Sequence, residues 1–461
     1  MSSAESLQQT IAAWICGTRL SEITELRQEL AARSFADALA ALAAGMDAEQ
    51  THKAAKALRL DMPAPQLLSD CLQADGRRLD RLLVLATAAH SCEFNDLFYA
   101  QPGHPGAVLA PTVLLTALSC RADGTRMLES YLCGLEVMGQ INRAMIPEHH
   151  FRGFHTTATA GVFGAAAAAG KLLGLNTEQM AAALAIAATS AGGLRANLGH
   201  EVNSLHVGFA ASHGLRAALL ARGGIDVCAD LLERPDGFAA AFGVKPDALR
   251  QAAGRLEQES VLDHPGLLLK RYPTCYSTCQ AIDAALALRG KPGFALRNIR
   301  QIIILTSPNH YLSLPMRWPD SVYGQRFCIP FCVAMALAGR PITLEGMAGL
   351  HADEPELLLL REKIQYGVEE VQKGRTDFGS TLIRLRNADG TEQSARAFPD
   401  PADRVEHWTL PRLRAKFALC TEPVLGAKAS QTLWQTFSSA EAIRNIRDLQ
   451  GAVGRCLVGL F

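Results

Sequence analysis

Apolar residues recur every three or four positions through the first half of the chain, which is the spacing of amphipathic helices. Alanine is abundant from Ser2 to about Gly254, and Gly or Pro interrupts the pattern at intervals. The clearest predicted helices are Leu79–His90, Gly106–Ser119, Gly124–Met145 and Thr177–Ala191. The most apolar stretch, Thr156 to Leu175, carries Lys171, so we interpret it as a buried packing helix and not as a membrane span.

The pattern changes after Leu262. Strands are predicted at Ile299–Thr306, which is β-branched, and at Thr376–Arg386 and Thr391–Phe398, which flank a turn at Asn387–Gly390. Apolar residues at helical spacing occur in the same region near Tyr276–Arg289 and Phe327–Gly339. The helical spacing returns from Asp403 through Val458. The predicted fold is therefore mainly α: a large all-helical domain from residues 1–265 and 402–461, with a smaller α+β domain inserted at 266–401.

Composition narrows the function classes. The 461 residues include 45 Lys and Arg against 45 Asp and Glu, and this balance argues against binding to nucleic acid or to a membrane surface. The segment Met1–Arg19 lacks the pattern of a signal peptide, so we expect a cytoplasmic protein. The 12 Cys are scattered, and Cys275 and Cys279 have no matching His pair, so the spacing predicts no metal site.

Four segments place polar residues where a helix bundle does not need them. In the first, an acidic cluster with Glu93 and Asp96 ends a helix and precedes an isolated His104. A carboxylate and an imidazole in one pocket suit acid/base chemistry. A helix end followed by a solvated loop explains the same spacing equally well.

The second and third segments each place His at or near a helix start. His155 and Thr156 begin a long Ala/Gly helix, where backbone N–H groups favour an anion, although a purely structural cap fits as well. Asn203 and His206 lie in a polar stretch between two Ala-rich helices, which is either a ligand-binding loop or a solvated connector.

The fourth segment, Lys270–Cys279, lies at the predicted domain junction. Lys270, Arg271 and Ser277 offer charges and hydrogen bonds that suit a carboxylate. The alternative is a surface Lys-Arg pair ahead of a structural helix start.

The four segments together, in this order, resemble the MmgE/PrpD family. Its most distinctive stretch is similar to the run Gly153–Ala166, and the similarity extends to residues 90–107, 192–214, 270–284 and 326–339. The family includes 2-methylcitrate dehydratase, cis-aconitate decarboxylase and iminodisuccinate epimerase. The resemblance implies a homodimer of a large helical domain and a lid-like α/β domain, without metal or organic cofactor, that acts on a small polycarboxylate.

The resemblance also implies roles for single residues. His155 and His104 would be the acid/base pair, Lys270 and Arg271 would hold carboxylates, and Glu93 and Asp96 would orient an imidazole or accept a proton. We expect Asn203, His206, Thr156 and Ser277 to bind substrate. The chain departs from the family pattern at Glu93 (Asp), Asn95 (Asp), Leu97 (Thr or another small polar residue), Asn203 (Lys) and Cys279 (His).

The departure at Asn203 removes a carboxylate partner, so we expect a smaller, neutral-headed or differently shaped acid; Arg195, His200 and Arg271 could supply other charge. The first hypothesis for the activity is a hydro-lyase similar to 2-methylcitrate dehydratase. The alternatives, in order, are an epimerase, a cis-aconitate decarboxylase and an inactive homologue that serves as a binding partner.

Overall fold

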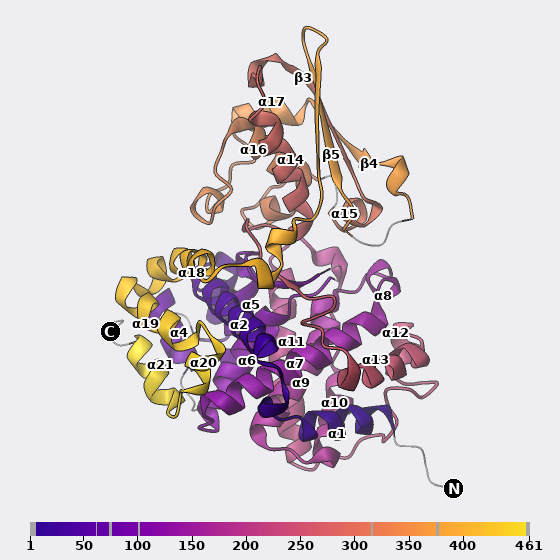
Figure 1. The fold of residues 1–461 in the computed structure, drawn as a ribbon, viewed down its shortest axis with the longest axis vertical. Helices are drawn as coiled ribbons and strands as arrows, with labels where there is room; N and C mark the ends of the chain where they lie inside the picture. Colours follow the sequence, from indigo (N-terminus) through magenta and orange to yellow (C-terminus); the bar gives the residue numbers. More distant parts are fainter. Residues whose placement is uncertain are drawn as a thin grey trace.

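The protein consists of a large helical body below a smaller body that contains the main sheet (Figure 1). This computed structural model describes residues 6–60, 62–72, 76–99, 102–314, 317–374 and 378–457. Ser2, Thr376 and Val458, at the ends of predicted segments, lie outside the described residues. The fold is mainly α, and this prediction is confirmed.

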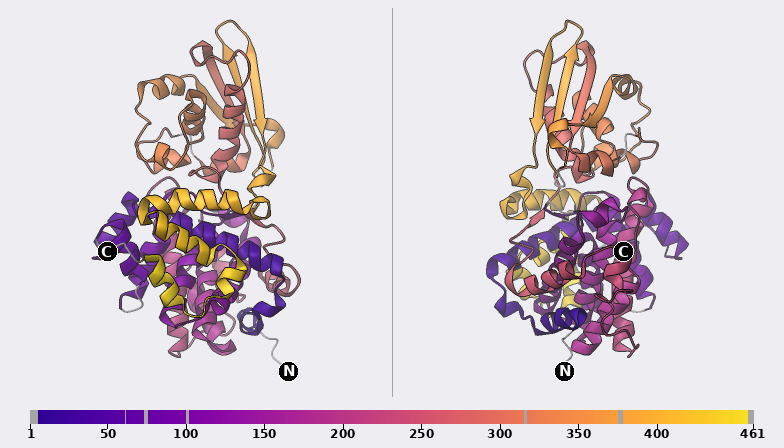
Figure 2. Two further views of the ribbon diagram at one scale, coloured as in Figure 1. Left: turned by 60° about the vertical axis from the view of Figure 1, so that its left-hand side comes forward. Right: turned by 90° about the vertical axis from the view of Figure 1, so that its right-hand side faces the viewer.

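The helical body combines both ends of the chain around one hydrophobic core, whose residues run from Leu7 to Leu269 and from Val405 to Val453. Its helices before residue 266 are α1 (Leu7–Gly17), α2 (Glu25–Gly45), α3 (Glu49–Ala57), α4 (Ala64–Leu72), α5 (Arg78–Ser91), α6 (Pro105–Ser119), α7 (Gly124–Met145), α8 (Glu148–Phe151), α9 (Thr156–Leu173), α10 (Thr177–Thr189), α11 (Val202–Arg222), α12 (Phe238–Phe242) and α13 (Pro246–Gln258). The last helices are α18 (Leu410–Leu425), α19 (Ala427–Phe437), α20 (Ala440–Arg444) and α21 (Leu449–Leu457). Figure 2 shows α18 lying across the top of this body, where it packs against α2.

Helix α9 is the centre of this body. It packs against α6, α7 and α11, and nearly all of its side chains are buried. Small residues allow the close approach, because a Cβ added at Gly164 would lie 2.7 Å from the Met138 Cβ and 2.9 Å from the Gly134 carbonyl oxygen. The predicted packing helix is therefore present, and no described helix is both long and apolar enough to cross a membrane.

The smaller body packs helices against a four-stranded sheet of order β4-β3-β5-β6. Its strands are β3 (Ile299–Thr306), β4 (Ile364–Val368), β5 (Thr381–Asn387) and β6 (Glu392–Ala397), and its helices are α14 (Cys279–Arg289), α15 (Pro308–Ser313), α16 (Ile329–Ala338) and α17 (Pro355–Arg361). The predicted β3 and the hairpin of β5 and β6 are present, and β5 starts later than expected. The short parallel strand β4 was not predicted from the sequence.

A two-stranded ribbon connects the junction between the bodies to the segment that follows α5. Strand β1 (Leu97–Phe98) pairs antiparallel with β2 (Leu267–Leu268), so Leu97 lies opposite Leu268. Residues after α5 and residues before α14, far apart in sequence, thus lie side by side. The predicted boundaries at 265/266 and 401/402 remain predictions, but two separate apolar cores occupy the two bodies.

The carboxyl group of Glu136 on α7 should make stability fall as the pH rises. Glu136 is buried and accepts hydrogen bonds from the Ser260 hydroxyl and from the Val261 backbone N–H. Burial raises the pKa of Glu136 to about 7, against 4.5 for a free Glu. The folded state therefore binds a proton that the unfolded state releases, and this contribution is present below pH 4.5 and lost as the pH rises through about 7.

Glu136→Gln mimics the protonated group, so the variant should be more stable than the parent by about 1–3 kcal/mol at about pH 8 and similar to it near pH 5. Chemical denaturation at both pH values measures this difference. Glu257→Gln, at an exposed position of the neighbouring α13, is the matched control and should change little at either pH. An equal effect of Glu136→Gln at the two pH values would contradict the prediction.

Candidate active site

Three helix N-termini meet at a cluster of imidazoles. His104 is the N-cap of α6, His155 is the N-cap of α9, and His206 lies near the start of α11. The ring centroids of His155 and His206 are 5.3 Å apart, and His90, in the last turn of α5, lies 4.7 Å from His104 and 6.3 Å from His155. Because the first N–H groups of a helix lack intrahelical partners, three such ends create a local positive potential for an anion.

The proton of His104 has a fixed position. Its Nδ1 lies 2.9 Å from the backbone carbonyl oxygen of Asp96, which can only accept, so Nδ1 carries the hydrogen. Burial, followed by the charge of Lys270, holds the pKa of His104 well below its usual range. The ring is therefore neutral near pH 7 and its Nε2 carries a lone pair, as a general base requires.

His155 and His206 form a coupled pair. Their Nδ1 atoms lie 3.1 Å apart, so one ring donates and the other accepts. Burial and then the neighbouring His206 hold the pKa of His155 well below its usual range, and burial lowers that of His206 to about 4. Both rings are therefore neutral at neutral pH.

A buried ion pair lies beside the imidazoles. The Lys270 ammonium donates to Glu93 Oε2 at 2.8 Å, and Glu93 Oε1 lies 3.0 Å from His90 Nε2. Burial acts to raise the pKa of Glu93, but the charges of His90 and Lys270 outweigh it and hold that pKa well below its usual range. Glu93 is the only partner of Lys270 among the described residues, which leaves two N–H donors for a ligand.

A residue of the smaller body reaches the same cluster. The hydroxyl of Tyr323 accepts from Asn203 Nδ2 and from the Ser204 hydroxyl, both at 3.1 Å, and donates to Glu93 Oε1 at 3.4 Å. The site therefore lies where the two bodies meet.

Asp96 supports the site from behind. Its carboxylate accepts from the Ser34 hydroxyl at 2.7 Å and from the Gly106 N–H at 2.9 Å, while its backbone carbonyl holds His104. Burial, and then the charge of Asp37, raises the pKa of Asp96 to about 7. We predicted that Asp96 orients an imidazole or accepts a proton; its carboxylate oxygens are engaged with Ser34 and Gly106, and its backbone carbonyl is the group that orients His104.

A second buried cation holds this supporting layer together. Lys416 of α18 lies 2.7 Å from Asp37 Oδ1 and donates to the carbonyl oxygen of Phe94 at 2.8 Å. The C-terminal part of the chain thus fixes the loop that carries Glu93 and Asp96.

The other predicted substrate-binding residues lie outside the cluster or are engaged elsewhere. The guanidinium of Arg271 is paired with Asp283 at 2.8 Å and with Asp403 at 2.5 Å, so the structure assigns it to the domain junction and not to the proposed carboxylate site. The Thr156 hydroxyl donates to the Pro102 carbonyl at 2.6 Å, which anchors the loop before His104. Ser277 is buried in a 3-10 turn, Tyr276–Thr278, next to Cys275.

Two of the departures from the family pattern are packed among apolar side chains. Leu97 and Cys279 belong to a small apolar cluster with Leu268, Tyr276 and Phe378. Their side chains therefore serve packing at the junction.

Sequence analysis did not assign roles to His90, Tyr323 or Arg326. His90 belongs to the first polar segment, but helical spacing alone gave no reason to separate it from a buried core His. Arg326 is buried and donates to the backbone carbonyls of Cys92, Pro273 and Met347 at 3.4, 2.7 and 3.1 Å. Tyr323 was not predicted either, because no His and no cluster of charged residues lies near it in the sequence.

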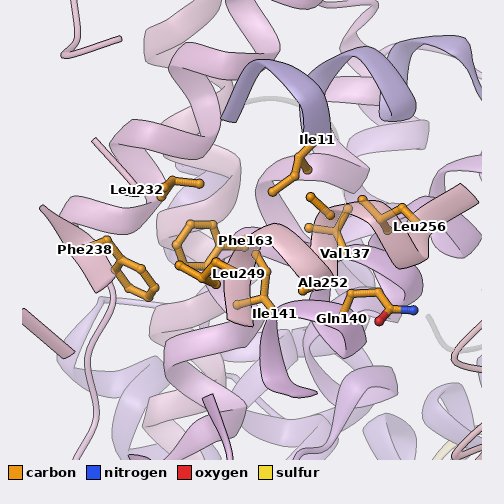
Figure 3. Close-up of a pocket in the computed structure, with 11 residues that line it drawn as sticks. Ile11, Val137, Gln140, Ile141, Phe163, Leu232, Phe238, Leu249, Ala252 and Leu256 are labelled. Carbon is orange, nitrogen blue, oxygen red and sulfur yellow. The ribbon is translucent and has the colours of Figure 1, made fainter. Parts of the chain in front are cut away.

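An apolar pocket elsewhere in the helical body does not suit a polycarboxylate (Figure 3). It lies between α1, α7 and α13, and Gln140 is its only polar lining residue. Its free volume of about 10 Å³ is roughly that of a single water. The imidazole cluster is thus the better candidate for the active site.

Three residues of the cluster could in principle bind a metal ion, which sequence spacing did not indicate. Potential ligand atoms of His90, Glu93 and His104 lie within 4.8 Å of one another. The arrangement fits a divalent metal poorly, because the Lys270 ammonium lies 2.8 Å from the Glu93 carboxylate and would repel a second cation. Both ring nitrogens of His90 also face oxygen atoms, Asn95 Oδ1 at 3.1 Å and Glu93 Oε1 at 3.0 Å.

We therefore predict that exhaustive chelation leaves turnover of the purified protein unchanged. The measurement compares turnover before and after chelation, with metal content determined on the same samples. Loss of activity on chelation, restored by one divalent metal, would contradict this prediction.

Two protein-family models match most of this chain. Residues 9–251 match the MmgE/PrpD N-terminal domain, and residues 272–441 match the MmgE/PrpD C-terminal domain. The chain belongs to the MmgE/PrpD family. The matched C-terminal region includes both the smaller body and α18, which packs on the helical body.

Several curated relatives are cis-aconitate decarboxylases. The chain is 27% identical to that of Homo sapiens over 462 residues, which covers 97% of this chain and 93% of the relative. It is 28% identical to that of Mus musculus over 359 residues (72% and 70%) and 34% identical to that of Aspergillus terreus (strain NIH 2624 / FGSC A1156) over 352 residues (68% and 70%). These relatives are lyases, and they support the expectation that this MmgE/PrpD chain is an enzyme.

Proposed function

We propose that this chain is a lyase that removes a proton from a carbon next to a carboxylate on a small hydroxy acid and expels water. One observation carries this proposal. The lone pair of His104 lies on Nε2 in a buried site beside Lys270, and two N–H donors of the Lys270 ammonium have no partner among the described residues. A base and a cation at one place are what formation of an enolate-like intermediate needs.

The proposed reaction breaks a C–H bond and a C–O bond and forms a C=C bond and water. His104 Nε2 takes the proton from carbon, the C–H electron pair becomes the new C=C bond, and the C–O bond breaks. Protonated His155 gives its proton to the departing oxygen, and water leaves. Burial holds the pKa of His155 low and keeps the ring neutral, so we expect a bound carboxylate to raise this pKa and charge the ring. Lys270 stabilises the negative charge that develops on the carboxylate.

Decarboxylation is the second candidate, because the curated relatives are named for it. In that reaction the bond to the departing CO₂ supplies the electron pair, and a protonated imidazole delivers a proton to the carbanion. The same residues can serve both reactions, since each passes through an enolate-like species. An epimerase would use the two imidazoles without a leaving group.

Incubation of the protein with hydroxy-, unsaturated and imino-di- and tricarboxylates distinguishes these reactions. Dehydration predicts a new ultraviolet absorbance from the C=C bond without release of CO₂. Release of CO₂ would establish decarboxylation instead, and deuterium uptake without net conversion would establish epimerisation. No reaction with any acid would overturn the proposal and favour an inactive binding homologue.

A further inference from the structure

Asn203 has a buried side-chain oxygen that no donor among the described residues reaches. The residue is 1% exposed, and its Nδ2 is engaged with Tyr323, 3.1 Å away, while lying 3.4 Å from His90 Nε2. Among the described residues, nothing donates to its Oδ1. Buried carbonyl oxygens are rarely left without a donor, because an unmade hydrogen bond costs stability. A ligand with an O–H or N–H group at this place would satisfy the oxygen, whereas a carboxylate would be repelled by it.

The charges around the cluster are also few. Lys270 and Glu93 neutralise each other, and His104, His155 and His206 are neutral at neutral pH. Arg326 adds one buried positive charge, because it donates to backbone carbonyls and no carboxylate among the described residues pairs with it. His90, whose positive charge helps to hold the pKa of Glu93 low, adds a second. Two net positive charges do not compensate three carboxylates in a buried site.

From the unpartnered Asn203 oxygen and this charge balance we infer that the substrate carries no more than two carboxylates and directs a hydroxyl or amino donor at Asn203. This inference rests on the proposed function and narrows its substrate class. It assigns Asn203 to specificity, as the acceptor that distinguishes a hydroxy or amino acid from its unsubstituted analogue.

Calorimetric binding of matched acids to the full chain tests the inference. Malate and aspartate each add one donor to succinate, and citrate adds a further carboxylate arm to a hydroxy acid. We expect malate or aspartate to bind about tenfold more tightly than succinate, as one well-made hydrogen bond allows, and citrate to bind more weakly than malate. The preference over succinate should disappear in Asn203→Leu, which keeps the size and removes the acceptor.

Gln140→Met is the matched control, because Gln140 is another buried amide whose Oε1 has no donor in the described part of the chain, and it lies in the apolar pocket instead. That variant should keep the preference. Equal binding of succinate and malate, tighter binding of citrate, or no binding of any acid would overturn the inference, and the wild-type measurements decide this even if Asn203→Leu does not fold. Because binding is measured and not turnover, a protein that binds malate selectively but catalyses no reaction would refute the proposed function alone.

Discussion

Replacing His155 by Gln should lower turnover by about 10²- to 10⁴-fold while the fold persists. The amide of Gln can replace the hydrogen bond that His155 Nδ1 makes with His206 Nδ1, 3.1 Å away, but it cannot exchange a proton with substrate. Turnover per folded molecule and melting temperature should be measured on the same preparation.

His213→Gln is the matched control for this prediction. His213 lies on α11, as His206 does, but it stacks on Phe209, whose side chain is exposed, with a centroid distance of 5.9 Å. This variant should retain normal turnover. If His155→Gln instead lowers only the melting temperature and turns over normally, His155 is a structural N-cap of α9 and has no part in the reaction.

Replacing Lys270 by Met should lower turnover by about 10²- to 10³-fold, which is the usual cost of removing one group that stabilises developing negative charge. It should also destabilise the fold by about 3–5 kcal/mol, because buried Glu93 would lose the ammonium and keep only His90 as a partner of positive charge. Activity and the free energy of unfolding therefore fall together in the single variant.

The double variant Lys270→Met/Glu93→Gln separates the two effects. It removes both charges of the buried pair, so we expect much of the stability to return. Turnover should stay low, because the ammonium that holds the substrate carboxylate is still missing. Recovery of turnover together with stability would mean that Lys270 serves only to neutralise Glu93.

The sequence predicted much of the fold because local patterns specify it. The helix Gly124–Met145 and the strand Ile299–Thr306 were placed at their observed bounds, since long periodic or β-branched runs are strong signals. Strand β4 was missed because it has only five residues, one of them Gly367, and its pairing with β3 is a long-range contact.

The site was predicted less evenly. His104, His155, Glu93 and Lys270 stood out because their polar segments interrupt apolar helices, and the structure brings these four together. In the sequence, Arg271 is as good a candidate for carboxylate binding as its neighbour Lys270. The structure shows that Arg271 already forms ion pairs with Asp283 and Asp403. Tyr323 and Arg326 come from the smaller body, and no local pattern marks a residue that becomes functional only when two bodies meet.

Uptake of deuterium from solvent into the carbon next to a carboxylate is the most direct measurement of the central claim. The protein should be incubated in deuterated water with each acid that the binding experiment identifies, and the exchange followed by proton NMR. We predict exchange catalysed by the parent protein and nearly abolished in His104→Gln, because the Nε2 lone pair that takes the proton is then missing. Exchange in His104→Gln at the rate of the parent, or no exchange by the parent with any acid that binds, would contradict the claim that this imidazole cluster removes a proton from carbon.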